Sequence, residues 1–216
     1  MGHTLSFLLG REQITGNGEL GEIVERSLLG MYRGGLWDHL GRGFCRYSTD
    51  SRWLVPHFEK MLYDNALLLM AYADGYASTK KTLFADVCKG IAGYVAEYLT
   101  DDSGVFYSAE NADSEGEEGR FYVFTRKEFR EIVDTRYSAM LEEYFGVEDA
   151  GNFEHGKNIL HVALNPEQWR ARHGLSEANA DSLLEATRLA LKNTRSKRVH
   201  PSLDDKILAS WNGLII

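Results

Sequence analysis

Residues 56 to 77, PHFEKMLYDNALLLMAYADGYA, limit most strongly what this chain can fold into. At a period of 3.6 residues, apolar side chains cover nearly the whole circumference of a helix over this range. They are Phe58, Leu62, Leu69 and Tyr72 on one side, and Tyr63, Leu67, Met70 and Ala73 on the other. Because a helix that is apolar all round must be buried, the segment predicts an inner helix that begins near Pro56 and is enclosed by other helices.

The rest of the chain supplies candidates for the surrounding layer. Residues 82 to 99 carry one apolar stripe opposite charged residues, which predicts an outer, amphipathic helix. Residues 41 to 55 and 104 to 125 are short aromatic and β-branched pieces around polar turns, typical of β-hairpins. The predicted fold is therefore all-α in the main, with helical hairpins and short β-hairpin loops. Further helices are predicted over 20 to 33, 126 to 144 and 177 to 194, and from about Leu203.

Charge and cysteine content exclude several classes of function. Lys and Arg total 24 against 32 Asp and Glu, a formal charge of -8, and no basic run alternates with aromatic residues as a nucleic-acid groove requires. Cys45 and Cys88 have no CxxC or Cys/His ligand spacing, so we expect no disulfide framework, metal site or cofactor. No stretch has transmembrane length and no signal peptide is recognisable, which predicts a cytoplasmic protein that contacts no membrane.

His57 is the first candidate for chemistry. In the predicted helix it would share one stripe with Lys60 and Asp64, whose charges would tune an imidazole toward neutral pH. We therefore predict that His57 is a general acid or base, as needed by an isomerase that removes a proton beside a carbonyl. The alternative is that His57 bonds backbone groups in the first turn while Lys60 and Asp64 pair at the surface.

The run ENADSEGEEG, residues 110 to 119, concentrates carboxylates. Glycoside hydrolysis uses two carboxylates, one as acid and one as base or nucleophile, so Asp113 and Glu115 are predicted to be catalytic. Counted from Asn111 as an EF-hand calcium loop, the run fails, because the twelfth position holds Tyr122 instead of a bidentate Glu. The alternative is a solvated acidic turn.

Other residues are predicted to hold a ligand or to join the chemistry. Asp205, in the pair Asp204–Asp205 before a predicted helix, is a further catalytic candidate, although capping of that helix would explain both acids. The alternative for the aromatic candidates below is a place in the core. Stacking walls for a sugar ring are predicted from Trp37, Tyr47, Trp53, Phe58 and Trp211, with Asp38, Arg46, Asp64 and Asn212 as polar partners.

Four motifs together resemble the spermatogenesis-associated protein 20 family of thioredoxin-domain-containing proteins. In chain order they are GLWDHLGRGFCRYSTDSRWLVPHFEKMLYDNA, SAENADSEGEEGRFYVFTRKEF, GNFEHGKNILH and HPSLDDKILASWNGL. The resemblance extends from about residue 20 and concerns the helical region that follows the family's thioredoxin-like domain. It implies an (α/α)6 toroid, similar to six-hairpin glycosidases and N-acylglucosamine 2-epimerases, with loops that line a central cleft. Residues 20 to 216 would be part of such a toroid, and residues 1 to 19 a leader or an added segment.

Two classes of function follow. The first is a carbohydrate-active domain, epimerase- or glycosidase-like, with acid/base chemistry at the cleft and a small sugar ligand. The second is a binding module without chemistry that holds a ligand or client for the thioredoxin-like domain. The pattern supplies roughly half the helices of a closed toroid, so we expect little catalysis from this chain. Apolar faces left uncovered in a half-toroid would favour a symmetric homodimer.

Overall fold

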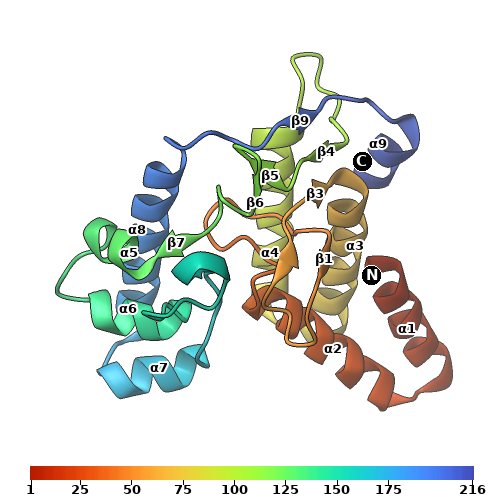
Figure 1. Cartoon of the computed structure of the whole chain (residues 1–216). Helices are drawn as coiled ribbons and strands as arrows, with labels where there is room; N and C mark the ends of the chain where they lie inside the picture. Colours follow the sequence, from red (N-terminus) through yellow and green to blue (C-terminus); the bar gives the residue numbers. More distant parts are fainter.

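The computed structural model describes all 216 residues, and the protein is mainly helical (Figure 1). A π-helical turn, η1 (Val95–Leu99), extends α4, and a short 3-10 turn, η2 (Glu154–Gly156), precedes β8. The α-helices are α1 Gly2–Thr15, α2 Gly18–Arg33, α3 Leu62–Thr79, α4 Thr82–Tyr94, α5 Arg126–Ile132, α6 Ser138–Phe145, α7 Pro166–His173, α8 Glu177–Arg195 and α9 Ala209–Ile215. The strands are β1 Tyr47–Ser48, β2 Pro56–His57, β3 Lys60–Met61, β4 Ala109–Glu110, β5 Asp113–Ser114, β6 Glu117–Glu118, β7 Phe124–Thr125, β8 Lys157–Asn158 and β9 Leu203–Asp204.

Helix α3 is the inner helix, in contact with α1, α2, α4 and α9 (Figure 1). Leu62, Leu68 and Tyr72 are fully enclosed, and the Tyr72 hydroxyl donates a 2.7 Å hydrogen bond to the carbonyl of Leu28 in α2. Met70 and Tyr76, by contrast, are 48% and 40% exposed, so one side of α3 stays uncovered. The predicted inner helix is confirmed, with burial on most but not all of its circumference.

The predicted start of this helix at Pro56 is wrong. Pro56 and His57 pair with β1, and Lys60 and Met61 pair with β4, so the backbone stays extended up to Leu62. The strand pairs use the N–H and C=O groups that a helical turn would need. As a consequence His57, Lys60 and Asp64 do not share a helical stripe.

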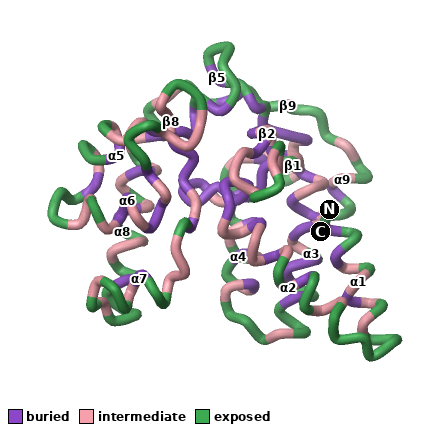
Figure 2. The backbone as a smooth tube through the Cα atoms, turned by 60° about the horizontal axis from the view of Figure 1, so that its bottom comes forward, coloured by how far each residue is buried: buried purple, intermediate pink, exposed green.

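Buried apolar side chains form two separate clusters. One has 25 buried residues, mainly from α1 to α4, and the other has 13, mainly from α5 to α8. We call these parts the first and second lobes; they lie at the right and the left of Figure 1, and buried segments run through both in Figure 2. Tyr32 packs against both clusters, and α9 adds Trp211 and Ile215 to the first.

The outer-helix prediction is confirmed in the first lobe. Helix α4 and η1 bury Phe84, Val87, Ile91 and Val95 along one stripe and pack on α3. Residues 2 to 15 also belong to this lobe, because α1 packs on α2 and α3 and buries Leu5 and Leu9.

In the second lobe the helix predicted over 126 to 144 is two helices. The Asp134 carboxylate accepts the Arg136 backbone N–H at 3.0 Å, a local turn that separates α5 from α6. Glu142 of α6 then ties the two helices together through ion pairs with Arg126 and Arg130 of α5. The helix predicted over 177 to 194 is confirmed as α8.

Residues 196 to 208 form a strap that crosses the first lobe between α8 and α9 (Figure 1). Within the strap, β9 pairs with β4, which also pairs with β3. The helix predicted from about Leu203 therefore begins only at Ala209, because Leu203 and Asp204 are held in this sheet. No helix of the protein combines the length and apolar character needed to cross a membrane.

Candidate functional site

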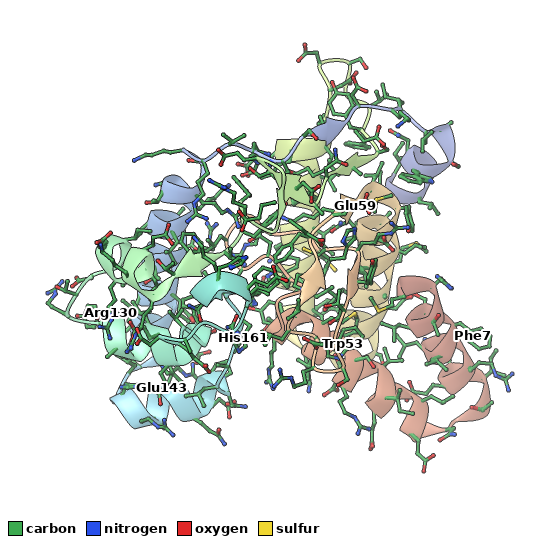
Figure 3. The ribbon with its side chains drawn as sticks, viewed as in Figure 1. Phe7, Trp53, Glu59, Arg130, Glu143 and His161 are labelled. Carbon is green, nitrogen blue, oxygen red and sulfur yellow. The ribbon has the colours of Figure 1, made fainter.

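A hollow of about 490 Å³ opens on the first lobe beside the loop between α2 and α3. Aromatic and charged side chains meet there, among them four predicted ligand-binding residues. Arg46, Tyr47 and Trp53 come from the loop, and Asp64 comes from the first turn of α3. The lining also includes Asp50 and Tyr63. Figure 3 labels Trp53 and Glu59, which mark this part of the molecule.

Asp50 fixes the shape of the loop. Its carboxylate accepts backbone N–H groups of Arg52 at 2.6 Å, Leu54 at 3.2 Å and Val55 at 2.8 Å. Partial burial opposes these hydrogen bonds, but together they lower the pKa of Asp50. Both carboxylate oxygens of Asp50 are therefore occupied by its own loop.

Trp53 occupies a left-handed backbone position, with φ at 64°. A side chain on Gly34 would lie 2.1 Å from the Trp53 carbonyl oxygen, and one on Gly30 would lie 3.1 Å from its ring. These two glycines of the α2 end let the loop lie directly against the helix. The Trp53 ring therefore forms a fixed wall of the hollow.

His57 lies next to the hollow and pairs with a carboxylate of the acidic run. Its Nδ1 is 2.7 Å from Oε1 of Glu118, and its Nε2 is 3.7 Å from Oε2 of Glu59. The imidazole stacks on Tyr47, with ring centroids 5.1 Å apart, and Glu59 also accepts a 3.0 Å hydrogen bond from Arg46. Arg46 and Tyr47 thus connect His57 to the hollow.

The predicted catalytic carboxylates lie elsewhere. Asp113 is exposed in β5, Glu115 pairs with Arg120 at 3.0 Å, and Asp205 is exposed in the strap. None of the three forms an ion pair or hydrogen bond with His57. Glu118 takes that place because a side chain on the next residue, Gly119, would lie 2.4 Å from the Phe58 ring, so the chain returns directly beside His57.

Two predicted stacking residues belong to the core. Trp37 is 1% exposed and packs 4.7 Å from Phe44, while Phe58 is 2% exposed and stacks 5.4 Å from Tyr122. The predicted stacking role of both is wrong, since neither ring presents a free face to a ligand. The alternative of a core position holds for this pair.

Two further predicted ligand-binding residues, Trp211 and Asn212, are in α9. Trp211 packs against Tyr63, with ring centroids 4.7 Å apart, so it stands behind the wall of the hollow. Asn212 is buried and joins α9 to the loop after η1, because it accepts from the Phe106 N–H at 2.8 Å and donates to the Phe106 carbonyl at 2.9 Å. Asn212 therefore has a structural contact instead of the predicted ligand contact.

Asp38, predicted to orient a ligand, is the centre of a buried ionic cluster with Lys60 and Arg195. Arg195 donates two hydrogen bonds of 2.8 Å to the carboxylate, and Lys60 donates one of 2.8 Å. Burial alone would raise the pKa of Asp38, but Arg195 and Lys60 together hold it well below its usual range. Arg195 ends α8, so the cluster joins the two lobes.

Gly41 makes room for this cluster. A side chain there would lie 2.4 Å from the Arg195 guanidinium and 2.8 Å from the Asp38 carboxylate. The glycine lies inside the motif GLWDHLGRG, but Arg195 lies outside the four motifs, five residues before the last one, and no local pattern pointed to it. Sequence reasoning named Asp38 and Lys60, but it assigned Asp38 to a ligand and Lys60 to the tuning of His57.

A second buried acid, Glu110 of β4, lies opposite Lys60 of the cluster in the pairing of β3 with β4. It is 3% exposed, and its Oε2 accepts a 2.5 Å hydrogen bond from the Tyr94 hydroxyl. Its Oε1 lies 3.2 Å from Nδ1 of His200 in the strap.

Cys45 is also enclosed in this part of the protein. Burial raises the pKa of its thiol to about 12, which leaves the thiol protonated and unreactive at neutral pH. No three His, Cys, Asp or Glu side chains are grouped so as to hold a metal ion.

Comparison with known proteins points to one set of relatives. No protein-family model matches the chain. Spermatogenesis-associated protein 20 of Homo sapiens is 39% identical over 90% of this chain, and its Mus musculus counterpart is 37% identical over the same share. An uncharacterised protein of Caenorhabditis elegans is 35% identical over 90% of the chain. The chain spans 28% of the length of the two mammalian relatives and 30% of the nematode one, so it is similar to part of spermatogenesis-associated protein 20.

Proposed function

We propose that this chain is the part of a spermatogenesis-associated protein 20 family member that binds a small sugar, within a carbohydrate-active domain. The observation that carries the proposal is the meeting of aromatic and charged side chains in the hollow, directly beside the His57–Glu118 pair. Sugar sites combine flat apolar faces with a few oriented polar groups. Tyr47, Trp53 and Tyr63 supply the faces, and Arg46 and Asp64 supply polar groups.

In this proposal His57 and Glu118 are an acid/base pair. The Glu118 carboxylate accepts the Nδ1 proton of the imidazole, which leaves Nε2 with a lone pair. In an epimerase, that nitrogen would take a proton from a carbon beside a carbonyl. In a glycosidase, a carboxylic acid would donate a proton to the leaving oxygen. The partial (α/α)6 toroid is part of the same proposal. It is supported by the inner helix α3 and by the loop that precedes this helix and lines the hollow.

A binding module without chemistry is the second candidate. It is favoured by the open position of His57, whose side chain is 26% exposed, because water would compete with a substrate for the imidazole. In this case the hollow holds a ligand or a client for the thioredoxin-like domain of the full-length protein. The two candidates share the hollow and differ only in proton transfer.

Calorimetric titration of a panel of neutral monosaccharides tests the shared part. Tyr47→Ala is expected to weaken binding about tenfold, since a lost aromatic contact costs on the order of 1 kcal/mol. Tyr76→Ala is the matched control, because Tyr76 is similarly exposed, at 40% against 45%, but lies at the other end of α3. If no sugar binds, or if both variants bind like the parent chain, the site is elsewhere.

Proton exchange separates the two candidates. In D2O, an acid/base site replaces a sugar C–H by deuterium, and NMR detects the loss of that proton signal. His57→Gln is expected to abolish the exchange while sugar affinity stays within about threefold. Binding by the parent chain without C–H exchange and without hydrolysis of a glycoside would instead establish the binding module.

A further inference from the structure

Asp64 is the one carboxylate of the hollow with an unused buried oxygen. Its Oδ2 is enclosed and has no hydrogen-bond partner, although the residue lines the hollow. Burial raises the pKa of Asp64, against the opposing effects of Tyr63, the Met1 α-amino group and Arg46. A buried acceptor without a donor costs free energy, so a ligand that brings a donor to Asp64 gains more there than elsewhere on the surface.

The other charged side chains of the hollow are already engaged, and the Met1 α-amino group, which also lines the hollow, acts on Asp64 through its charge. Arg46 donates a 3.0 Å hydrogen bond to Glu59, and both Asp50 oxygens accept backbone N–H groups. The positive charge of Arg46 is thus matched by Glu59, which is not part of the lining. Asp64 is left as the group that would face the charge of a ligand.

Three aromatic rings line the same hollow as Asp64. Tyr47, Trp53 and Tyr63 line the same hollow, and the faces of such rings attract cations. A carboxylate within an aromatic wall suits a group that carries positive charge, donates hydrogen bonds and has apolar carbon next to it. An alkylammonium group has all three properties, whereas a hydroxyl group lacks the charge.

We propose that the hollow selects a sugar that carries a free ammonium group. The inference rests on the proposed sugar-binding function and names its substrate class. The ammonium donates to Asp64 while the ring carbons beside it lie on the aromatic walls. A neutral sugar donates only an uncharged hydroxyl to Asp64, and an N-acetylated amino sugar loses the charge and gains an acyl group.

Three probes of matched shape test this selection: glucosamine, glucose and N-acetylglucosamine, titrated at a pH at which the amine is protonated. Glucosamine is expected to bind at least tenfold more tightly than the other two. Asp64→Asn is expected to lower the affinity for glucosamine about tenfold and so to remove that preference. Asp74→Asn, an exposed acid of the same helix, is the matched control and should keep the preference.

The outcomes separate this inference from the function on which it rests. If glucose and glucosamine bind equally well and Tyr47→Ala weakens both, the sugar site stands and the ammonium selectivity is overturned. If Asp74→Asn removes the preference as Asp64→Asn does, a general surface charge is responsible and the inference is likewise overturned. If no probe binds, both proposals fail. Circular dichroism and a thermal melt of Asp64→Asn show whether that variant is folded.

Discussion

Single buried polar residues carry much of the specific geometry of this protein. His39 is an example, since it is enclosed at the boundary between the lobes and its Nε2 donates a 3.1 Å hydrogen bond to the Gly34 carbonyl. The neutral ring is favoured there. Burial lowers the pKa of His39 to about 4, although the Gly34 hydrogen bond and Asp38 act in the opposite direction.

This shift predicts a loss of stability in mild acid. The unfolded chain binds a proton at His39 below about pH 6.5, whereas the folded chain does so only near pH 4, so the free energy of unfolding falls as the pH drops through that window. His39 alone contributes about 3 kcal/mol to the fall. Urea unfolding at pH 7 and pH 4.5 measures this fall in the free energy of unfolding. The fall is expected to be smaller in His39→Gln, whose amide retains a donor, than in the parent chain.

His3→Gln is the control for this experiment, because His3 is exposed. Its pH dependence should match that of the parent chain. An unchanged pH dependence in His39→Gln would show that this imidazole is accessible to protons in the folded state.

At the scale of elements, short helices depend on their caps more than on propensity. Helix α5 has seven residues, too few to be stable alone, and it starts with a capping box. The Thr125 hydroxyl accepts the Glu128 N–H at 3.1 Å, and the Glu128 carboxylate accepts the Thr125 N–H at 2.7 Å. The cap holds Phe129, which is fully buried, in the core of the second lobe.

Loss of this cap should destabilise the protein measurably. Thr125→Ala is expected to lower the free energy of unfolding by about 1 kcal/mol. The Glu128 N–H loses the hydroxyl that accepts it, and the reciprocal hydrogen bond from the Thr125 N–H is disturbed. Thr125→Ser should recover most of the loss. Thr82→Ala is a matched control, because Thr82 also starts a helix but makes no capping hydrogen bond. Equal urea midpoints for Thr125→Ala and Thr82→Ala would contradict the role of the cap.

At the scale of the whole molecule, apolar side chains remain uncovered on the first lobe. Phe7 and Ile14 of α1 are 64% and 77% exposed, and their spacing of seven residues places them on one face of the helix. Phe7 points away from the rest of the protein in Figure 3. Contact between copies through such a face would remove apolar surface from water at about 25 cal/mol per Å², before the costs of association.

We therefore expect a homodimer with a symmetric interface. Light scattering across a dilution series should show twice the monomer mass at micromolar concentration. The double variant Phe7→Asp, Ile14→Asp should shift the protein to monomer, whereas Leu189→Asp, an exposed leucine of the second lobe, should not. A parent chain that stays a compact monomer throughout the series would show that the exposed face binds no second copy.

The sequence by itself determined the elements whose signal is local. Periodicity located α2, the body of α3, the outer helix α4 and the long helix α8, because a helix face shows in the spacing of residues three and four apart. The same local reasoning brought Arg46, Tyr47, Trp53 and Asp64 into one candidate group, since all but one lie in a single loop. The prediction of a mainly helical chain depended only on this local spacing, and on no contact between residues far apart in the sequence.

Only the tertiary structure decided which residues meet across the chain. Strand pairing kept His57 out of the helix and gave it Glu118, sixty-one residues away, as its partner. Arg195 reached Asp38 across 157 residues and drew it into a buried cluster. Such pairs follow from loop closure and from the need to neutralise buried charge, which depend on the whole fold and leave no periodic trace in the sequence.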